Sequence, residues 1–351
     1  MNDRDRIKYI VIARGFANFF VVLLHTFVPE IRSDGPYVLT AFFWMNSFTF
    51  QLFMMISGYL YERGYLKYRD KGFGGFMRGK LRTIMLPYLT ISVFSYAGIG
   101  LAFLLPASAK VLYAGGYSKT GLGEAVFQII TYENHIIKHL WFLPTLFIIF
   151  LLTFLMGKFF AGLPGLIICL AMAVTSYCFK MPTLIYRVCS MFIFFNIGRR
   201  IKFIDFFSSK KWFVPLLAVF IGAFIVDRAG LFLNNRALAA LSAVVIGTTG
   251  SLTFFTFSKF IVDTAFGRRV SWIGDNSFVI YLLHQPFVVS GVCGVLLMYT
   301  ALPHPVICAV ALVLGISIPC LLNKYLIGRI RLLRGLILGD FMKNHETSGA
   351  A

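Results

Sequence analysis

The sequence predicts an all-α polytopic membrane protein, a bundle of about ten transmembrane helices with both termini in the cytoplasm. Hydrophobic residues make up 58% of the 351 residues and charged residues only 13%, about half the charge of an average soluble domain. Five segments contain no Asp, Glu, Lys or Arg: 35–61, 83–109, 139–157, 237–258 and 276–323. Since a helix needs about 20 apolar residues to cross a bilayer, these segments indicate membrane spans.

Ten apolar runs between polar or basic flanks predict helices at 9–28, 39–61, 83–105, 139–157, 162–179, 183–200, 212–229, 236–258, 272–293 and 305–327. With the N-terminus inside, the cytoplasmic segments hold about three times as many Lys and Arg residues as the outer ones, in line with the positive-inside rule. This bias and the even number of helices place both termini in the cytoplasm. It also accounts for the net charge of +19 without a nucleic-acid partner.

One domain is expected to fill the chain. Residues 1–330 are interpreted as a single transmembrane domain and 331–351 as a basic and polar cytoplasmic tail, whose end, MKNHETSGAA, is expected to be mobile. The one sizeable outer loop covers about 106–138 and is too short for a separate domain. Six cysteines lie in apolar segments without metal-ligand spacing, so they are interpreted as small core residues and no metal is predicted.

The first predicted helix carries a cation and an imidazole within an apolar run. Arg14 and His25 are 11 residues apart, which is about 16 Å along a helix and about 20° around it. Both therefore project from one face, Arg14 toward the cytoplasm and His25 near the outer end. Because a charge in hydrocarbon costs at least about 2.5–3.5 kcal/mol, the pair predicts a polar cavity beside this helix. The alternative is that Arg14 snorkels to the inner headgroups while His25 marks the outer interface.

A second candidate site is the basic loop that precedes the third predicted helix. It contains Arg78, Lys80 and Arg82 among seven basic residues and several glycines. Arg and Lys supply charge for phosphates, and glycine lets the backbone approach a ligand. The stretch is thus a candidate site for a polyanionic ligand, although the positive-inside rule alone also explains it.

Other histidines receive no catalytic role from the sequence. His135 and His139, beside Glu133, have i,i+4 spacing, but a zinc site needs a third ligand and none is indicated. A cluster at the membrane interface with Trp141 is the favoured interpretation. His284, within SWIGDNSFVIYLLHQPF, is interpreted as a residue that caps a kink or donates between helices rather than as a catalyst.

Five motifs in order resemble the membrane acyltransferase-3 family: YIVIARGFANFFVVLLH, QLFMMISGYLYERGY, KLRTIMLPYL, HLWFLPTLF and WIGDNSFVIYLLH. The resemblance covers about 6–327. It implies transfer of an acyl group, usually acetyl, from cytoplasmic acyl-CoA to a hydroxyl of an envelope polysaccharide or lipid-linked glycan. By the same resemblance His25 is the catalytic imidazole, Arg14 its companion on the donor path, and Arg78, Lys80 and Arg82 bind the CoA phosphates.

Two positions depart from the family pattern. Asp often stands three residues before the arginine of the first helix, and this chain has Val11 there. The inner motif is commonly Arg-x-x-Arg, but the residue three before Arg82 is Gly79, so Arg78 or Lys80 is expected to substitute.

The resulting hypothesis is a multi-pass O-acyltransferase of the inner (plasma) membrane. Its donor substrate is acetyl-CoA or another acyl-CoA, and its acceptor is a glycan or lipid-linked glycan. Membrane lipids surround it, and a homodimer is compatible with this hypothesis. His25 acts either as a base or as a carrier of the acyl group. The alternatives are a polysaccharide exporter or flippase that performs no chemistry, and a structural subunit of a glycan-synthesis complex.

Overall fold

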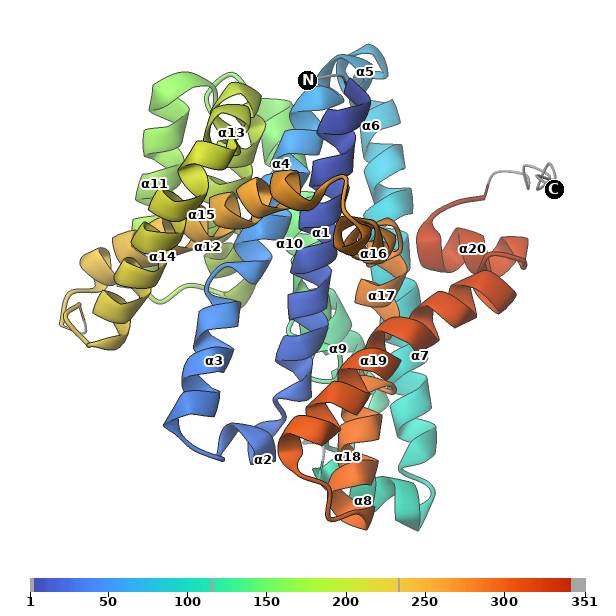
Figure 1. Cartoon of the computed structure of the whole chain (residues 1–351). Coiled ribbons are helices and arrows are strands. Elements are labelled where there is room, and N and C mark those ends of the chain that lie inside the picture. The colour runs from blue at the N-terminus through green and yellow to red at the C-terminus, as the bar shows by residue number, and fades with distance from the viewer. Residues whose placement is uncertain (1–2, 115–116, 233, 342–351) are drawn as a thin grey trace. The chain divides into compact units, whose positions relative to one another are not determined.

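A computed structural model of the chain describes residues 3–114, 117–232 and 234–341, without the side chains of 3–7 and 114. Over this part the protein is helical and contains no strand (Figure 1), as expected for an all-α protein. The tail sequence MKNHETSGAA, 342–351, lies outside the described residues. The described residues form two compact units, one within 1–73 and 148–277 and the other within 74–147 and 278–351. The prediction of one functional domain over 1–330 stays a prediction.

Unit 1 is built on the first helix. Its helices are α1 (Asp3–Thr26), α2 (Pro29–Arg32), α3 (Pro36–Asn46), α4 (Thr49–Arg63), α5 (Tyr65–Asp70), α11 (Gly162–Cys178), α12 (Thr183–Arg199), α13 (Ile201–Phe207), η3 (Lys210–Trp212), α14 (Phe213–Arg228), α15 (Arg236–Ile261) and α16 (Ala265–Asp275). Helix α1 packs against α4, α15 and α16, while α12 packs against α4 and α11, and α14 against α15.

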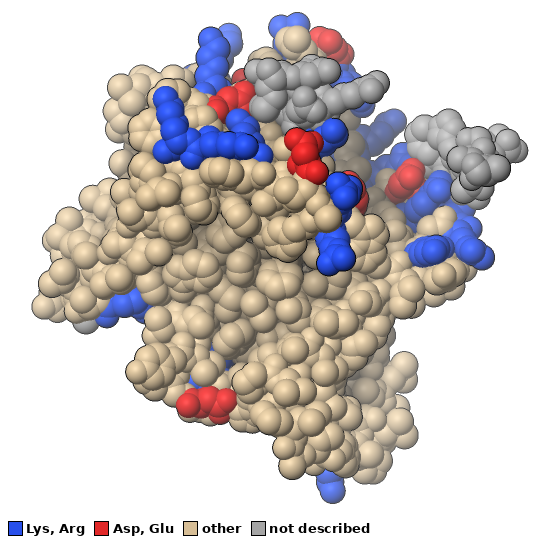
Figure 2. Space-filling model, in the orientation of Figure 1, with Lys and Arg blue, Asp and Glu red and all other residues tan. Residues whose placement is uncertain are grey.

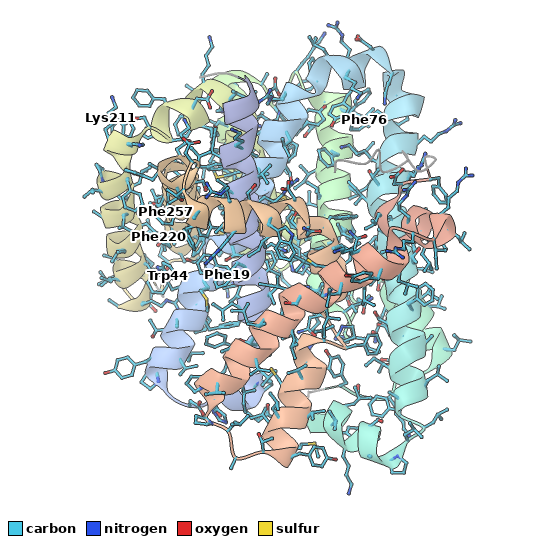
Figure 3. The ribbon with its side chains drawn as sticks, turned by 45° about the vertical axis from the view of Figure 1, so that its right-hand side comes forward. Phe19, Trp44, Phe76, Lys211, Phe220 and Phe257 are labelled. Carbon is cyan, nitrogen blue, oxygen red and sulfur yellow. The ribbon has the colours of Figure 1, made fainter. Side chains whose placement is uncertain are left out.

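Aromatic side chains fill the core of unit 1. Phe48 and Phe220 are completely buried, and Phe48 stacks on Phe254 with ring centroids 4.6 Å apart. The ring centroids of Trp44 and Phe220 lie 5.5 Å apart, and Figure 3 labels both side chains. Such pairs stabilise a core beyond their buried area, and they fix α3, α4, α14 and α15 around one another.

Helices α4 and α12 touch through glycine. A Cβ atom at Gly58 would overlap the carbonyl oxygen of Phe195, and one at Gly198 would overlap that of Met55. Small residues let helix backbones approach closely in membrane proteins. Gly58, in the motif Ser57-Gly58-Tyr59, is therefore a packing residue. The contact continues to the helix ends, where Arg199 donates to the Glu62 carboxylate at 2.9 Å.

Unit 2 combines two segments distant in sequence. Its helices are α6 (Gly72–Lys80), η1 (Leu81–Met85), α7 (Leu86–Ala102), α8 (Pro106–Ala114), α9 (Leu122–Thr131), η2 (Lys138–Trp141), α10 (Phe142–Met156, which continues into unit 1), α17 (Ser277–Leu283), α18 (Val289–Tyr299), α19 (His304–Leu322), η4 (Asn323–Ile327) and α20 (Arg331–Leu338). Helix α7 packs against α9 and α20, and α18 against α8 and α19. The expected outer loop 106–138 thus contains two helices, α8 and α9.

Six helices of the described chain are long and apolar enough to cross a membrane, and α13 with η3–α14 forms a seventh span if the bent pair is counted as one. The predicted spans 162–179 and 183–200 correspond to α11 and α12, of 17 residues each. The number of ten crossings and the side of the termini stay predictions. In unit 1, Lys and Arg side chains gather at the end that holds α5 and α13 (Figure 2), which is the distribution that the positive-inside rule expects.

The single helix predicted over 272–293 is wrong, because this segment contains the end of α16, all of α17 and the start of α18. Helix α16 begins earlier, where the Thr264 hydroxyl caps it by accepting from the Gly267 N–H at 2.9 Å, and it ends as the Asn276 amide donates to the Trp272 carbonyl. Such local side-chain bonds compete with helix continuation. Pro286, which has no N–H to donate, separates α17 from α18.

Candidate active site

The face of α1 that carries Arg14 and His25 is continuous. Helix α1 runs without a break over Asp3–Thr26, so the helical spacing applies directly and both residues project from one face. Asn18 lies four residues after Arg14 and seven before His25, on the same face. The structure therefore places three polar side chains in a row within residues 10–25 of α1, a stretch that is otherwise apolar.

Arg14 is held at the C-terminal end of α16. Its Nε donates to the carbonyl oxygen of Gly274 at 2.9 Å, and the neighbouring Asp275 carboxylate attracts the guanidinium. The last carbonyl groups of a helix lack partners within the helix and attract cations. Arg14 is therefore held by a helix end within unit 1, and the alternative that it snorkels to the inner headgroups stays a prediction. The resemblance places an Asp at the position that Val11 occupies here, and in this structure the carboxylate beside Arg14 belongs to Asp275.

Two glycines permit this contact between α1 and α16. A Cβ atom at Gly15 would overlap the carbonyl oxygen of Val270, and one at Gly274 would overlap that of Val11. The backbones of the two helices therefore touch on both sides of the Arg14 hydrogen bond. This packing fixes the position of the guanidinium.

Asn18 is a candidate site residue that the sequence reasoning missed. Its side chain is completely buried, and among the described residues neither the Oδ1 nor the Nδ2 atom has a hydrogen-bond partner. Leaving a buried polar group without a partner costs about 1–3 kcal/mol. The i+4 spacing from Arg14 was the available signal, but an uncharged amide did not stand out beside an arginine. The unmet donor and acceptor indicate a place for a polar ligand group or water.

His25 occupies the last turn of α1 and is partly exposed. The following Thr26 is completely buried, and its hydroxyl donates to the Leu23 carbonyl at 2.8 Å, so the helix stays ordered up to its end. An imidazole at this position is held by regular helix yet remains accessible. Those are the conditions that a group in proton or acyl transfer requires.

In unit 2, two of the three predicted phosphate ligands share one groove. Arg78 and Arg82 line an open hollow of about 580 Å³ together with apolar side chains that include Met77, Leu81 and Met85. Lys80 is absent from this lining, and its Nζ lies 5.5 Å from the centre of the Phe76 ring. Gly79 occupies the first position of the Arg-x-x-Arg motif. Arg78 is better placed than Lys80 to substitute for the missing arginine, because it lines the groove together with Arg82.

Arg82 also contacts the end of α20. Its Nε donates to the carbonyl oxygen of Gly339 at 2.7 Å, and its guanidinium lies 4.8 Å from the centre of the Phe341 ring. Gly339 has a φ of 68° and ends α20 in the left-handed conformation that commonly closes helices. Arg82 lies in η1, a π-helical turn of the kind that is frequent at functional sites.

The structure separates His135 from His139. His135 is exposed, whereas His139 is buried with its ring 4.8 Å from that of His284, which is also buried. The His284 Nδ1 contacts the carbonyl oxygen of Ile280 at 2.9 Å, and the Tyr281 hydroxyl donates to the His139 carbonyl at 2.6 Å. The His284 Nδ1 thus contacts the turn that precedes it, and the structural role predicted for His284 stays a prediction. Its pairing with His139 depends on tertiary packing and had no sequence signal.

Burial raises the pKa of the Tyr117 phenol, also in unit 2, to about 12. Its hydroxyl donates to Gln285 Oε1 at 3.2 Å. Tyr117 therefore stays protonated at neutral pH and acts as a hydrogen-bond donor in unit 2.

The structure places Arg14 and His25 on one face of α1 in unit 1, about 16 Å apart along its axis, and it places Arg78 and Arg82 in the lining of one groove in unit 2. The polar cavity predicted beside the first helix stays a prediction, as do the roles of all five residues. Within the described chain no three His, Cys, Asp or Glu residues are grouped as metal ligands.

Residues 7–323 match the acyltransferase-3 family model, described as an acyltransferase domain. No curated protein and no solved structure matches the chain.

Proposed function

Because this chain belongs to the acyltransferase-3 family of membrane acyltransferases, we propose that it is an O-acyltransferase of the inner (plasma) membrane. It moves an acyl group, in the first place acetyl, from cytoplasmic acyl-CoA to a hydroxyl of an envelope polysaccharide or lipid-linked glycan. The observation that carries this proposal is the row Arg14, Asn18 and His25 on one face of an unbroken helix.

His25 performs the proton transfer in this proposal. The acceptor oxygen attacks the thioester carbonyl carbon, the carbon–sulfur bond breaks, and the imidazole takes the hydroxyl proton and returns it to the CoA thiolate. In the second route the imidazole nitrogen attacks the thioester carbonyl carbon, and the carbon–sulfur bond breaks to release the CoA thiolate. The acceptor hydroxyl then attacks the acyl-imidazole, the acyl–nitrogen bond breaks, and the hydroxyl proton passes to the thiolate. Both routes need a neutral imidazole within reach of both substrates.

Arg14 and Asn18 support this chemistry electrostatically. Arg14, fixed by its bond to the Gly274 carbonyl, supplies positive potential along the helix face. Asn18 has an unmet N–H donor for a carbonyl oxygen on which negative charge develops and an unmet acceptor for an amide N–H. Preorganised donors of this kind are the largest contributors in many acyl transfers.

The donor site is proposed at the groove of Arg78 and Arg82. Two guanidinium groups beside an apolar hollow of about 580 Å³ suit a molecule with phosphates at one end and a flexible apolar arm, as acyl-CoA has. Lys80 contributes positive potential from outside the groove.

The test is transfer of labelled acetyl from acetyl-CoA to glycan in membranes that contain His25→Ala or the control His135→Ala. Removing a general base lowers the rate about 10²–10⁴-fold, and the exposed His135 offers a matched substitution whose activity should equal that of the wild type. Full activity of folded His25→Ala would overturn the catalytic assignment. Mass spectrometry of the protein after acetyl-CoA alone separates the two routes, because only the covalent route adds acetyl to His25.

The same assay separates the alternatives. An exporter or flippase moves glycan without transferring label, and a structural subunit tolerates His25→Ala while its complex still assembles. Loss of one O-acyl ester from the surface glycan of cells without the protein would support the enzyme and identify the acceptor.

A further inference from the structure

A cavity of about 380 Å³ lies within unit 1, between α3–α4, α11, α14 and α15. Its polar lining includes Asn46, Gln51, Asp227, Arg228 and Arg236, and its apolar lining is largely aromatic. This volume is within the ~300–1,000 Å³ typical of small-molecule sites. The cavity is distinct from the groove of Arg78 and Arg82, because the two linings share no residue.

The cavity coincides with the break between α3 and α4. Helix α3 ends at Asn46 and α4 begins at Thr49, inside a segment long and apolar enough to be one span. The Ser47 hydroxyl donates to the Trp44 carbonyl at 2.7 Å, which satisfies one of the exposed backbone groups. Non-helical backbone at membrane depth is tolerated where it is buried in protein or lines a watery cavity, and discontinuous helices build binding sites in transporters.

Gln51 provides an unmet acceptor at this cavity. Its Oε1 atom is shielded from solvent and has no hydrogen-bond partner among the described residues. Gly247 makes room for the side chain, since a Cβ atom there would lie 2.8 Å from Gln51 Cγ. A glutamine held in this way at a cavity wall indicates a ligand with a donor group, such as a hydroxyl.

The charges of the cavity leave one cation available. Arg228 donates to the Asp227 carboxylate at 2.7 Å, and its guanidinium lies 4.8 Å from the centre of the Phe43 ring. Arg236 donates to the Cys178 carbonyl at 3.3 Å, and no acidic side chain of the described residues forms an ion pair with it. The cavity therefore has a net positive charge beside aromatic surface.

We propose that this cavity binds a sugar residue that carries an anionic group, as the acceptor subsite of the acyl transfer. The proposal rests on the proposed function for its role, though not for the binding itself. Aromatic rings pack against the apolar face of a pyranose, Gln51 and Asn46 bind hydroxyls, and Arg236 binds a carboxylate or phosphate. The anionic group has two sources, a uronic acid within a polymer or the phosphate of a lipid-linked sugar.

Binding is tested on protein purified in a detergent without a sugar headgroup, by saturation-transfer NMR titration with glucuronic acid, glucose 1-phosphate and glucose. We expect one or both anionic sugars to bind more tightly than glucose, and Arg236→Gln to weaken that binding about 10-fold or more, as loss of a charged hydrogen bond does. Glucuronic acid as the tighter ligand indicates the polymer, and glucose 1-phosphate the lipid-linked precursor.

Lys180→Gln is the matched control, because it removes an exposed cation from the same predicted side without lining the cavity. Gln51→Leu serves as a second variant that keeps the charge, and it should weaken all three sugars alike. Glucose binding as tightly as the anionic sugars, or unchanged binding by Arg236→Gln, would overturn the proposal. Binding of phosphatidylglycerol at this cavity, together with no binding of either anionic sugar, would also overturn it.

The role in transfer is tested separately from the binding. Arg236→Gln should raise the acceptor KM while kcat and acetyl-CoA binding stay unchanged. Arg236-dependent sugar binding in a protein without acyl transfer would retain the subsite and reject the proposed function. Acyl transfer with an unaltered acceptor KM in Arg236→Gln would reject the subsite and retain the function.

Discussion

Arg14 in unit 1 and Arg82 in unit 2 are held in the same way. Each donates its Nε to a glycine carbonyl at the end of a short helix, Gly274 in α16 and Gly339 after α20. Their surroundings differ, because α1 is unbroken and carries Asn18 and His25 along the same face, whereas Arg82 lies in a π-helical turn and faces an open apolar groove with Arg78.

The same anchoring contact therefore occurs in two kinds of surroundings. A regular helix spaces buried polar groups at fixed intervals, which suits chemistry that depends on distance. A π-helical turn beside an open groove suits a long ligand held by charge and apolar contact.

The largest effect is expected from Gly274→Leu. A side chain there overlaps the Val11 carbonyl and separates α16 from α1, and overpacking of this kind costs about 3 kcal/mol or more. The melting temperature of the purified protein should fall steeply. Gly222→Leu is the control, since a Cβ atom there meets nothing within 4 Å, and an equal fall in that variant would contradict the packing argument.

Asn18→Leu should have opposite effects on stability and activity. It replaces a buried amide that has no hydrogen-bond partner in the described structure with an apolar side chain of similar size, so unfolding should become harder by about 1 kcal/mol. Acyl transfer should fall about 10-fold or more as the donor for the developing charge is lost. Thermal unfolding and labelled-acetyl transfer measure the two effects, and lower stability with normal transfer would show that Asn18 has only a structural role.

The smallest effect concerns the open groove. Arg78→Ala should weaken acetyl-CoA binding about 3- to 10-fold, as expected for a partly exposed phosphate contact, while Lys80→Ala should change it less because its ammonium group lies over Phe76. Equilibrium binding of labelled acetyl-CoA gives both values. A stronger loss in Lys80→Ala would place the donor phosphates outside the groove.

The apolar segments of the sequence predicted the positions of the helices better than they predicted the breaks within them. The first helix was predicted at 9–28 and runs over Asp3–Thr26, since nothing in ARGFANFFVVLLHT interrupts it. The span 39–61 contains the α3–α4 break at Ser47 and Phe48, where neither Gly nor Pro gives a signal and the aromatic packing of Phe48 decides. In 272–293 the sequence shows Pro286, whereas the Thr264 cap that starts α16 lies ahead of this segment and depends on side-chain geometry.

The part of the candidate site that lies on a single helix was predictable from the sequence. Arg14 and His25 share a face by spacing alone, whereas the bond from Arg14 to Gly274 joins residues 260 positions apart. The pairing of His139 with His284 likewise requires the folded chain. Long-range contacts of this kind have no periodic pattern in a single sequence.

The glycine contact between α4 and α12 limits the motions available to unit 1. Because Gly58 and Gly198 each lie against a carbonyl of the opposite helix, one helix cannot slide by a turn of 5.4 Å past the other without driving side chains into backbone. The two helices therefore move as one rigid element. Any opening that admits substrate to unit 1 has to come from elements outside this pair.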